Sequence, residues 1–383
     1  MNKAVIVIPA LNPPPELSAL IKNLCRLDPE RKIIVYNDGS SESFTAIFEE
    51  IRQTFSQVIF LRHEINMGKG KTLKDAMSYV MQHFPHSGIV TADSDGQHAA
   101  EDILAVAAQL ENSGADLVLG VRDFSAPDIP PRSKFGNDMT CFIFRYLIGM
   151  NISDTQTGLR GISAKIMPAL LQLQGDRYEF ETEMLLEVHK QNFVLVQHPI
   201  STIYLNENSE SHFNPMVDSI LIYKRLFKCI FMRFFSFICS SVLSALIDLG
   251  IYSLLFFVVL AGMPGKLWWS VVIARIISSS CNYLINRNIV FAEKNKKYLA
   301  DTRSSVKYFT LVAVVMVLSY SITKLGIFLL NKVSPFYIKL TVDVLLFLFC
   351  FIMQNTIVFK RKEPISKLIP KEIEKSALMR SKR

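Results

Sequence analysis

The chain has 383 residues, 50% of them hydrophobic, and a formal net charge of +8. This length exceeds that of one ordinary domain, and the apolar fraction is too high for a purely soluble protein. Nucleic acid is not an expected partner, because much of the positive charge flanks the apolar stretches of the C-terminal half, where an anionic membrane surface accounts for it better.

The first 215 residues alternate short apolar strands with amphipathic helices. Strands are predicted at residues 3–9, 32–36, 58–62, 88–93 and 116–121, and helices at residues 16–27, 44–55, 71–84 and 99–110. This alternation predicts an α/β domain with a parallel sheet and right-handed crossovers. Ligands of such sheets bind beyond the carboxyl ends of the strands. The polar clusters of this half fall at those ends, at residues 9–12, 37–40, 93–97 and 122.

Two carboxylates stand one residue apart at the end of the fourth strand. Asp93 and Asp95 would be costly to bury without a cation between them, so they predict a site for a metal ion and a phosphate. Gln97 offers an amide oxygen that would complete a site for a hard cation. The alternative is a plain strand-to-helix turn, in which Asp95 and Gly96 form the turn and Asp93 caps the helix.

Two further loops have chemistry suited to a nucleotide diphosphate. Asp38, Gly39 and Ser40 supply a carboxylate and backbone donors at a helix start, which would read a base or a ribose, although the same residues form a common turn. Residues 66–71 (Asn-Met-Gly-Lys-Gly-Lys) resemble a phosphate loop but lack the Walker spacing. They predict a basic cap on a nucleotide pocket, and a solvated lysine pair is the alternative.

Seven short motifs of this half stand in a familiar order. They are Ile-Pro-Ala-Leu-Asn at 8–12, Tyr-Asn-Asp-Gly-Ser at 36–40, Asn-x-Gly-Lys-Gly at 66–70, Asp-x-Asp-x-Gln-His at 93–98, Gly-Val-Arg at 120–122, Asp-Thr-Gln-Thr-Gly at 154–158 and Tyr-Glu-Phe-Glu at 178–181. In this order they resemble glycosyltransferase family 2, and most of all its dolichyl-phosphate mannose synthase-like branch, which transfers a sugar to a polyprenyl phosphate. The resemblance covers residues 1–215.

The resemblance implies a GT-A (Rossmann-like) fold that uses Mg²⁺ or Mn²⁺ and inverts the anomeric carbon. The implied metal ligands are Asp95 and Gln97, and the implied acceptor-phosphate residues are Arg122, Arg132 and Gly136. The implied catalytic residues are Asp93, Asp95, Arg122 and Arg132. The implied nucleotide-sugar site consists of Pro9, Ala10, Leu11, Asn12, Asp38, Gly39, Ser40, Gly68, Lys69, Asp93, Ser94 and Asp95. Residues 123–131 predict a surface loop that would act as an acceptor lid, and surface arginines on a mobile loop are the alternative.

A phosphate monoester as acceptor would simplify the chemistry. Its second pKa is about 6, so near neutral pH it can attack the anomeric carbon without a general base. Catalysis would then rest on alignment and on metal stabilisation of the leaving diphosphate. The histidines of this half are therefore expected to be loop or supporting residues: His63, His83, His86 and His98.

Some positions depart from the family pattern. Leu11-Asn12-Pro13 replaces the usual Tyr-Asn-Glu, so any nucleotide contact from that Tyr or Glu is lost. Asn37 stands where many members have Asp, and Glu207 where the mannose synthases have a basic residue, which His212 would partly replace. The donor stays open for this reason, with UDP-glucose as the first expectation and UDP-GlcNAc and GDP-mannose behind it.

Beyond residue 215 the chain becomes apolar. Residues 216–232 mix apolar side chains with lysine and arginine, which predicts an amphipathic helix at the membrane interface. Four apolar segments long enough to span a bilayer follow, at residues 234–261, 267–291, 308–330 and 337–359. Basic residues cluster at 294–307 and after 360, which predicts that both termini and the catalytic domain are cytoplasmic. The expected regions are a glycosyltransferase domain at 1–215, the interfacial helix at 216–232, a membrane domain at 233–362 and a basic tail at 363–383.

The membrane half contains an internal repeat. Asn-Ile-Val-Phe at 288–291 recurs as Thr-Ile-Val-Phe at 356–359, and Leu-Gly-Ile-Tyr at 249–252 recurs as Leu-Gly-Ile-Phe at 325–328. The first two helices therefore recur as the last two.

The repeat also aligns ionisable residues with the sign of the charge exchanged. It aligns Asp248 with Lys324 and Arg275 with Asp343. Because a charge inside a bilayer is costly unless it is paired, we expect Asp248 to pair with Arg275 and Lys324 with Asp343, or the pairs to cross between the repeats. Long side chains that snorkel to the membrane surface are the alternative.

This half resembles the GtrA-like four-helix family, which occurs beside such glycosyltransferases or fused to them. The residues that carry the resemblance are Arg233-Phe-Phe, Asn282-Tyr, Asn286-Arg287, Phe309 and Asn355. The implied role is to place the lipid-linked sugar, and anchoring and flipping both stay open. The expected partners are a nucleotide sugar, undecaprenyl phosphate, the bilayer of a bacterial inner membrane and a second copy of the chain in a homo-oligomer.

Two other classes of protein are compatible with parts of the pattern. A processive polysaccharide synthase would share Asp93 and Asp95 but should carry Gln-x-x-Arg-Trp, whereas the only tryptophans stand in Leu-Trp-Trp-Ser at 267–270. A non-enzymatic carrier of lipid-linked sugar with a degenerate catalytic domain is disfavoured, because both aspartates and both predicted acceptor arginines are present.

Overall fold

The computed structural model describes residues 3–124, 131–201, 217–291, 302–330 and 333–359. The chain divides into two compact units, which are described separately. The first unit contains Met1–Cys141 and Asn151–Leu226. The second contains Phe142–Met150 and Phe227–Arg361.

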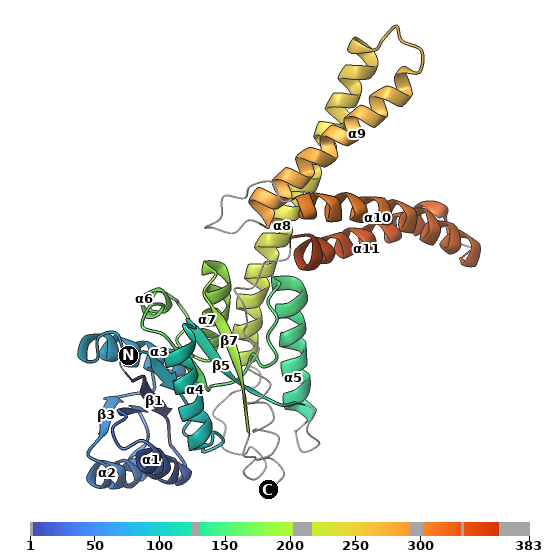
Figure 1. Cartoon of the computed structure of the whole chain (residues 1–383). Helices are drawn as coiled ribbons and strands as arrows, with labels where there is room; N and C mark the ends of the chain where they lie inside the picture. The colour runs from blue at the N-terminus through green and yellow to red at the C-terminus, as the bar shows by residue number, and fades with distance from the viewer. Residues whose placement is uncertain (1–2, 125–130, 202–216, 292–301, 331–332, 360–383) are drawn as a thin grey trace. The chain divides into compact units, whose positions relative to one another are not determined.

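The first unit is built on a seven-stranded sheet with the strand order β3-β2-β1-β4-β6-β5-β7 (Figure 1). Four of the five predicted strands form a parallel half: β1 (Val5–Ala10), β2 (Ile33–Asp38), β3 (Val58–His63) and β4 (Ile89–Thr91). The fifth, β5 (Leu117–Arg122), pairs in parallel with β7 (Leu195–Ile200), a strand that was not predicted.

The prediction of a wholly parallel sheet is wrong at one strand. β6 (Arg160–Ile162) lies between β4 and β5 and runs antiparallel to both. Its sequence is Arg-Gly-Ile, which lacks the apolar run by which the five predicted strands were recognised. The result is the mixed sheet of a GT-A-like domain.

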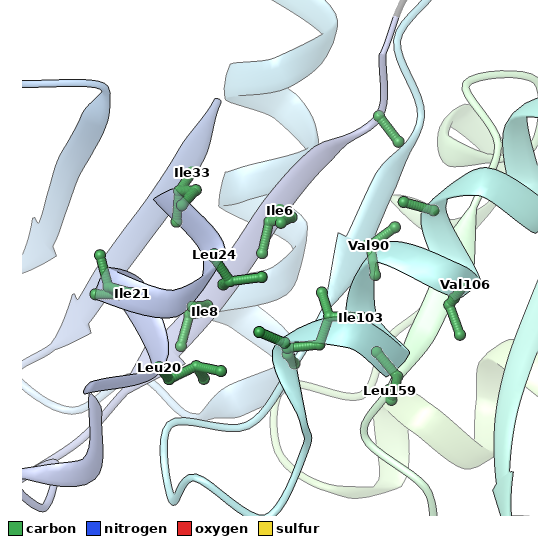
Figure 2. Close-up of a cluster of buried hydrophobic side chains, with 14 of the residues drawn as sticks. Ile6, Ile8, Leu20, Ile21, Leu24, Ile33, Val90, Ile103, Val106 and Leu159 are labelled. Carbon is green, nitrogen blue, oxygen red and sulfur yellow. The ribbon is translucent and has the colours of Figure 1, made fainter. Parts of the chain in front are cut away.

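Helices cover both faces of this sheet. The prediction for α1 (Glu16–Leu27) is confirmed at both ends, and its buried residues recur at the three- and four-residue spacing of a helix: Leu17, Leu20, Ile21 and Leu24. With α2 (Thr45–Thr54) and α4 (Ala100–Ser113), α1 covers one face and packs on β1, β2 and β4 (Figure 2). The remaining helical elements of this unit are α3 (Lys69–His83), η1 (Glu42–Phe44), α5 (Pro131–Phe142), α6 (Met167–Leu170) and α7 (Glu179–Gln191).

The second unit consists mainly of long helices, three of which end in a π-helical turn. They are α8 (Val217–Leu254) with η4 (Leu255–Val259), α9 (Lys266–Ile285) with η5 (Asn286–Val290), α10 (Thr302–Leu329), and α11 (Pro335–Met353) with η6 (Gln354–Val358). A further π-helix, η2 (Ile143–Ile148), continues α5 and belongs to this unit.

Within the described residues, three helices are long and apolar enough to span a membrane: Ile220–Val259, Arg303–Leu329 and Pro335–Val358. All four predicted apolar segments are helical, but the second, α9, is not among these three. It carries Arg275 together with several serines and Asn282, which lower its hydropathy. The predicted interfacial helix at 216–232 is not a separate element, because Val217–Leu254 is one uninterrupted helix.

The internal repeat is visible in the structure. η5 and η6 occupy corresponding positions and close in the same way, with the Phe291 N–H donating to Asn286 O and the Phe359 N–H donating to Gln354 O, each at 2.8 Å. Asn286 Nδ2 also donates to Gln354 Oε1 at 3.0 Å, and the rings of Phe291 and Phe359 stack at 5.2 Å. Equivalent residues of the two repeats therefore contact each other.

One of the two predicted intramembrane ion pairs is confirmed and the other is wrong. Arg275 Nη2 lies 3.5 Å from Asp248 Oδ2. Asp343 instead pairs with Lys339, one turn earlier in α11, whose Nζ lies 2.6 Å from its Oδ2. Lys324 lies over the Tyr320 ring. A partner at i−4 shares the helix face with Asp343, so it reaches the carboxylate without a contact between helices.

Candidate active site

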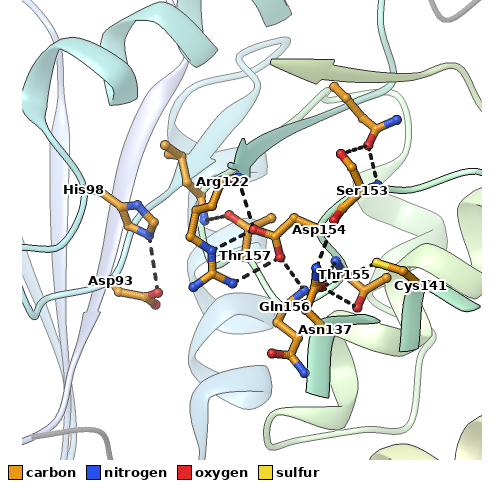
Figure 3. A network of polar contacts seen from close by, with 12 residues as sticks. Asp93, His98, Arg122, Asn137, Cys141, Ser153, Asp154, Thr155, Gln156 and Thr157 are labelled. Carbon is orange, nitrogen blue, oxygen red and sulfur yellow. Dashed lines mark hydrogen bonds and ion pairs between the residues drawn. The ribbon is translucent and has the colours of Figure 1, made fainter. Parts of the chain in front are cut away.

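Asp93 lies at the centre of a charged cluster beyond the carboxyl end of β4. Its Oδ1 accepts a hydrogen bond from Lys69 Nζ at 2.7 Å, and its Oδ2 lies 3.5 Å from Nε2 of the buried His98 (Figure 3). Lys69 begins α3, and its Nζ also lies 3.1 Å from Oε1 of Glu181 in α7. Two carboxylates thus share one lysine.

The opposite charges of this cluster stabilise each other's ionised forms. Burial opposes the ionisation of Asp93, but Lys69 and His98 outweigh it and hold the pKa of Asp93 below its ordinary value. Burial also disfavours the charged form of Lys69, yet Asp93 and Glu181 raise the pKa of Lys69 above its ordinary value. Asp93 and Lys69 are therefore both ionised at neutral pH.

The pKa of Asp95 is shifted in the opposite direction to that of Asp93. Burial, followed by the negative charge of Asp93, raises the pKa of Asp95, and its Oδ1 accepts the Gln97 N–H at 3.0 Å. In the part of the chain that the structure describes, no cationic side chain forms an ion pair with Asp95. Lys69 and His98 favour an ionised Asp95 only from a distance among the described residues, and a bound cation would supply a direct counter-charge.

This set of donors fits a divalent cation that is shared with a substrate. Among the described residues, no three His, Cys, Asp or Glu side chains could hold a metal ion by themselves. Mg²⁺ is commonly held by one or two carboxylates together with substrate phosphates and water, rather than by a complete protein cage. Asp95 fits this pattern, and the part of Gln97 as a second ligand stays a prediction.

The carboxylate of Asp93 packs on the motif at 154–158. A Cβ at Gly158 would overlap both carboxylate oxygens of Asp93, so this position has room only for glycine. Thr91 Oγ1, at the end of β4, donates to Gly158 O at 2.7 Å. Because β6 follows this motif directly and inserts beside β4, the antiparallel strand is what brings the motif to Asp93.

Asp38 has a supporting role that the sequence did not indicate. Its Oδ1 accepts the Met67 N–H at 3.0 Å and its Oδ2 accepts the Gly68 N–H at 2.9 Å. Its Oδ1 also lies 2.7 Å from Nδ1 of His63. Asp38 thereby fixes the loop that precedes Lys69, and a direct contact with a base or ribose stays a prediction.

The ends of β1 and β2 and the loops that follow them are joined by side-chain hydrogen bonds, and these two segments contain Pro9–Asn12 and Asp38–Ser40. The Asn12 N–H donates to Ser40 Oγ at 2.8 Å, and Asn12 Oδ1 accepts the Ser41 N–H at 2.9 Å. Gly39 adopts a φ of +74°, and a Cβ there would overlap the backbone of Ile65. The predicted nucleotide residues of β1 and β2 therefore lie side by side beyond the strand ends.

Two functional candidates in the middle of the chain were missed by sequence reasoning. Arg160 is 1% exposed, and its Nη1 donates to Glu181 O at 2.6 Å. Burial lowers the pKa of Arg160. Its Nε donates to Thr157 O at 2.9 Å, so Arg160 ties α7 to the 154–158 motif. Glu181 stands in one of the recognised motifs, but no spacing rule marked it as the partner of Lys69.

The first residues of α8 are tied to the same support. Arg177 Nε lies 3.2 Å from Oδ1 of the fully buried Asp218, and Arg225 Nε lies 2.7 Å from Glu183 Oε1. The segment before α7 in turn holds the start of α3, where the Lys71 N–H donates to Asp176 O at 2.9 Å. The first residues of α8 therefore belong to the scaffold that supports Lys69.

Arg122 is held by the buried carboxylate of Asp154. Its Nε donates to Asp154 Oδ2 at 2.7 Å and its Nη2 donates to Oδ1 at 3.1 Å, a bidentate contact (Figure 3). Gly136 lies in α5, where a Cβ would come within 3.3 Å of Gln156 Nε2. The predicted acceptor residues Arg122 and Gly136 therefore both border the 154–158 motif.

Several predicted features lie outside the described residues. These are the side chain of Arg132, most of the loop at 123–131, Glu207 and His212.

The sequence was compared with models of known protein families. The description "Glycosyl transferase family 2" matches residues 5–170, and "GtrA/DPMS, transmembrane domain" matches residues 236–359. Residues 5–170 therefore belong to a family 2 glycosyltransferase domain, and residues 236–359 to a GtrA/DPMS transmembrane domain. The resemblances stated for both halves of the sequence are thereby confirmed, and the chain is a membrane protein of the glycosyltransferase class.

Individual proteins of known name are similar to the glycosyltransferase half. UDP-N-acetylglucosamine–dolichyl-phosphate N-acetylglucosaminyltransferase of Methanococcus voltae is 29% identical over 237 residues, which are 58% of this chain and 94% of that protein. Polyprenol monophosphomannose synthase of Mycolicibacterium smegmatis is 22% identical over 206 residues, 52% of this chain and 77% of that protein. Among solved structures, glucosyl-3-phosphoglycerate synthase of Mycobacterium tuberculosis with Mn²⁺, UDP-glucose and phosphoglyceric acid aligns with a TM-score of 0.46 and 15% identity, over 60% of this chain and 80% of that chain.

Proposed function

We propose that this membrane glycosyltransferase moves a sugar from a nucleotide sugar to a polyprenyl phosphate, with inversion at the anomeric carbon. The observation that carries the proposal is the pair of carboxylates beyond β4. Asp93 is neutralised by Lys69, whereas Asp95 has no counter-ion among the described residues. The names of the two relatives, which both specify a polyprenol-type lipid, support the class of acceptor.

A divalent cation, Mg²⁺ or Mn²⁺, would be held by Asp95, with Gln97 as a further ligand. Such an ion supplies positive charge to the leaving diphosphate. The residues around Asp93 would hold the two carboxylates in position. Asp93, fixed by Lys69 and His98, presents a permanent carboxylate beside Asp95, and Asp38 fixes the loop that carries Lys69.

A phosphate acceptor would need no general base. The bond that forms joins an acceptor phosphate oxygen to the anomeric carbon, and the bond that breaks releases the nucleoside diphosphate. The phosphate monoester is already ionised near neutral pH, so no proton has to be removed. His98, the histidine nearest Asp93, is buried against that carboxylate and acts as its support.

Arg122 and Arg132 would receive the acceptor phosphate. A guanidinium can grip a phosphate through two parallel hydrogen bonds. Arg122 already makes such a bidentate contact with Asp154, so the acceptor phosphate would share or replace that carboxylate. The acceptor proposed is undecaprenyl phosphate in a bacterial inner membrane, with the glycosyltransferase domain in the cytoplasm. UDP-glucose is the first donor to test, followed by UDP-GlcNAc and GDP-mannose.

The test uses purified full-length protein in detergent. It is incubated with a panel of labelled nucleotide sugars, undecaprenyl phosphate and Mg²⁺ or Mn²⁺, and lipid-extractable label is counted. Asp95→Ala should abolish transfer, whereas Asp138→Ala, which removes an exposed aspartate of α5, should retain it. Label that appears in a growing polymer, or full activity of Asp95→Ala with every accepted donor, would refute the proposal.

A further inference from the structure

His63, the last residue of β3, lies between two carboxylates of the first unit. Its Nδ1 lies 2.7 Å from Asp38 Oδ1, and its Nε2 lies 3.0 Å from Asp75 Oδ2. The His63 side chain is only 12% exposed, so water competes little for either contact. Both nitrogens of one mostly buried imidazole therefore face a carboxylate oxygen.

The register of the sheet accounts for this arrangement. In the parallel pairing of β2 with β3, His63 lies directly beside Asp38, and paired residues of neighbouring strands direct their side chains to the same face of a sheet. Tyr36, two residues before Asp38, shares that face, and its hydroxyl lies 3.0 Å from His63 Nε2. Asp75 comes from the second turn of α3, which begins at Lys69. His63 thus contacts side chains of both β2 and α3.

The charged and titratable groups that adjoin the imidazole come from β2, from α3 and from its own segment. They are Tyr36 and Asp38 of β2, Asp75 of α3 with its partner Lys71, and the pair formed by Arg62 and Glu64 on either side of His63 in the chain. Burial, followed by the negative charges of Asp75 and Asp38, raises the pKa of Tyr36. Tyr36 therefore keeps its proton at neutral pH, and its hydroxyl adds no charge beside Nε2.

Only a doubly protonated imidazole can donate to both carboxylates. A neutral imidazole carries one N–H, so it can donate to Asp38 or to Asp75 but not to both. Asp38 also accepts the N–H groups of Met67 and Gly68, the two residues before α3. An imidazolium at His63 therefore joins the carboxylate that holds the entry to α3 to a carboxylate within α3.

We propose that His63, as an imidazolium that bridges Asp38 and Asp75, positions the start of α3 and with it Lys69 for the nucleotide sugar. His63 acts through these residues and is not itself a contact of the donor. The bridge is complete when the ring carries both protons, and it is lost as the pH rises and one proton leaves. Donor binding should therefore weaken across the range in which a histidine changes its charge, from about pH 5 to about pH 8. The inference rests on the proposed nucleotide-sugar site.

Hydrogen exchange of the full-length protein in detergent, without any ligand, tests the bridge itself. After correction for the intrinsic pH dependence of exchange, the protection of residues 64–72 should be at least threefold higher at pH 5.5 than at pH 8. His63→Asn keeps an N–H donor toward Asp38 but cannot titrate, so its protection should be the same at both pH values. His83→Gln removes an exposed histidine at the end of α3 and should behave as the wild type does. Unchanged protection in the wild type would overturn the proposal, even if a variant fails to fold.

A titration with UDP-glucose and Mg²⁺ tests the consequence for the donor. The dissociation constant of the wild type is divided by that of His63→Asn at each pH, because this ratio cancels the ionisation of Asp95, whose raised pKa acts in the opposite direction. The ratio should rise at least threefold from pH 5.5 to pH 8, and a constant ratio would overturn the link between His63 and the donor.

The two measurements separate this inference from the proposed function. Protection that falls with pH in a protein that binds none of UDP-glucose, UDP-GlcNAc and GDP-mannose would support the bridge and contradict the nucleotide-sugar site. Donor binding together with protection that does not change with pH would contradict the role of His63 alone.

Discussion

Replacing Lys69 by methionine tests the charged cluster beyond β4. The substitution keeps most of the side-chain volume but removes the positive charge that Asp93 and Glu181 share at 2.7 and 3.1 Å. The side chains of Lys69, Asp93 and Glu181 are only 14%, 30% and 10% exposed. Removing one partner of a buried ion pair costs about 3–5 kcal/mol, and the partial exposure of Asp93 favours the lower end, about 3 kcal/mol.

The pH dependence of this loss has a definite sign. In the wild type the pKa of Asp93 is lowered by folding, so its contribution to stability is present above its unfolded value of about 3.9 and is lost as the pH falls through the folded value. Without Lys69, burial favours the neutral form of Asp93 and raises its folded pKa, and stability is then lost as the pH rises towards that pKa. The deficit of Lys69→Met should therefore be larger at pH 8 than at pH 5.

Hydrogen exchange of α3 and α7, followed by mass spectrometry, measures this effect locally. Intrinsic fluorescence would not, because the only two tryptophans, Trp268 and Trp269, lie in α9. The control is Lys71→Met, which removes a more exposed pair with Asp75 and should cost less than about 1 kcal/mol. Equal protection losses in the two variants, or a Lys69→Met deficit that does not change between pH 5 and pH 8, would refute the reasoning.

Two further substitutions test the scaffold around Asp93. Gly158→Ala places a Cβ on the Asp93 carboxylate and should weaken nucleotide-sugar binding at least tenfold in a titration. The control is Gly114→Ala, at a positive φ with open space around it, which should lower stability by about 1 kcal/mol and leave binding unchanged. Equal binding by the two variants would show that the contact between Gly158 and Asp93 does not matter for the nucleotide sugar. Asp38→Asn replaces one acceptor of the Met67 and Gly68 N–H groups by an amide nitrogen and should destabilise that loop by about 1–3 kcal/mol. Faster exchange of these two amides is the expected result, and unchanged exchange would show that Asp38 does not hold the loop.

The sequence predicted those parts of the fold that follow from local patterns. The helix at Glu16–Leu27 is marked by apolar residues at helical spacing after a run of prolines, and the structure has the same bounds. β6 has three residues and forms only because β4 and β5 supply partners on both sides. No local sequence pattern therefore predicts this strand. Its consequence, the packing of the 154–158 motif on Asp93, was likewise not predictable from spacing.

The ion pairs were likewise predictable from the sequence only in part. Both predicted pairs followed from the repeat alignment and from the cost of an unpaired charge in a bilayer, and the pairing of Asp248 with Arg275 is confirmed. The pairing of Lys324 with Asp343 overlooked Lys339, four residues from Asp343 on the same helix face. At Asp38, the sequence showed a carboxylate at a strand end, but only the folded structure shows that backbone N–H groups from a loop about thirty residues later occupy it.

The lipid product of the reaction tests the central claim most directly. Purified protein, undecaprenyl phosphate, Mn²⁺ and the accepted nucleotide sugar are incubated, and the extracted lipid is analysed by mass spectrometry and by NMR of the anomeric centre. The expected product is undecaprenyl phosphate that carries a single sugar residue, with the anomeric configuration opposite to that of the donor. A polymer, free sugar released by hydrolysis, or a lipid-linked sugar with the donor's configuration would contradict it.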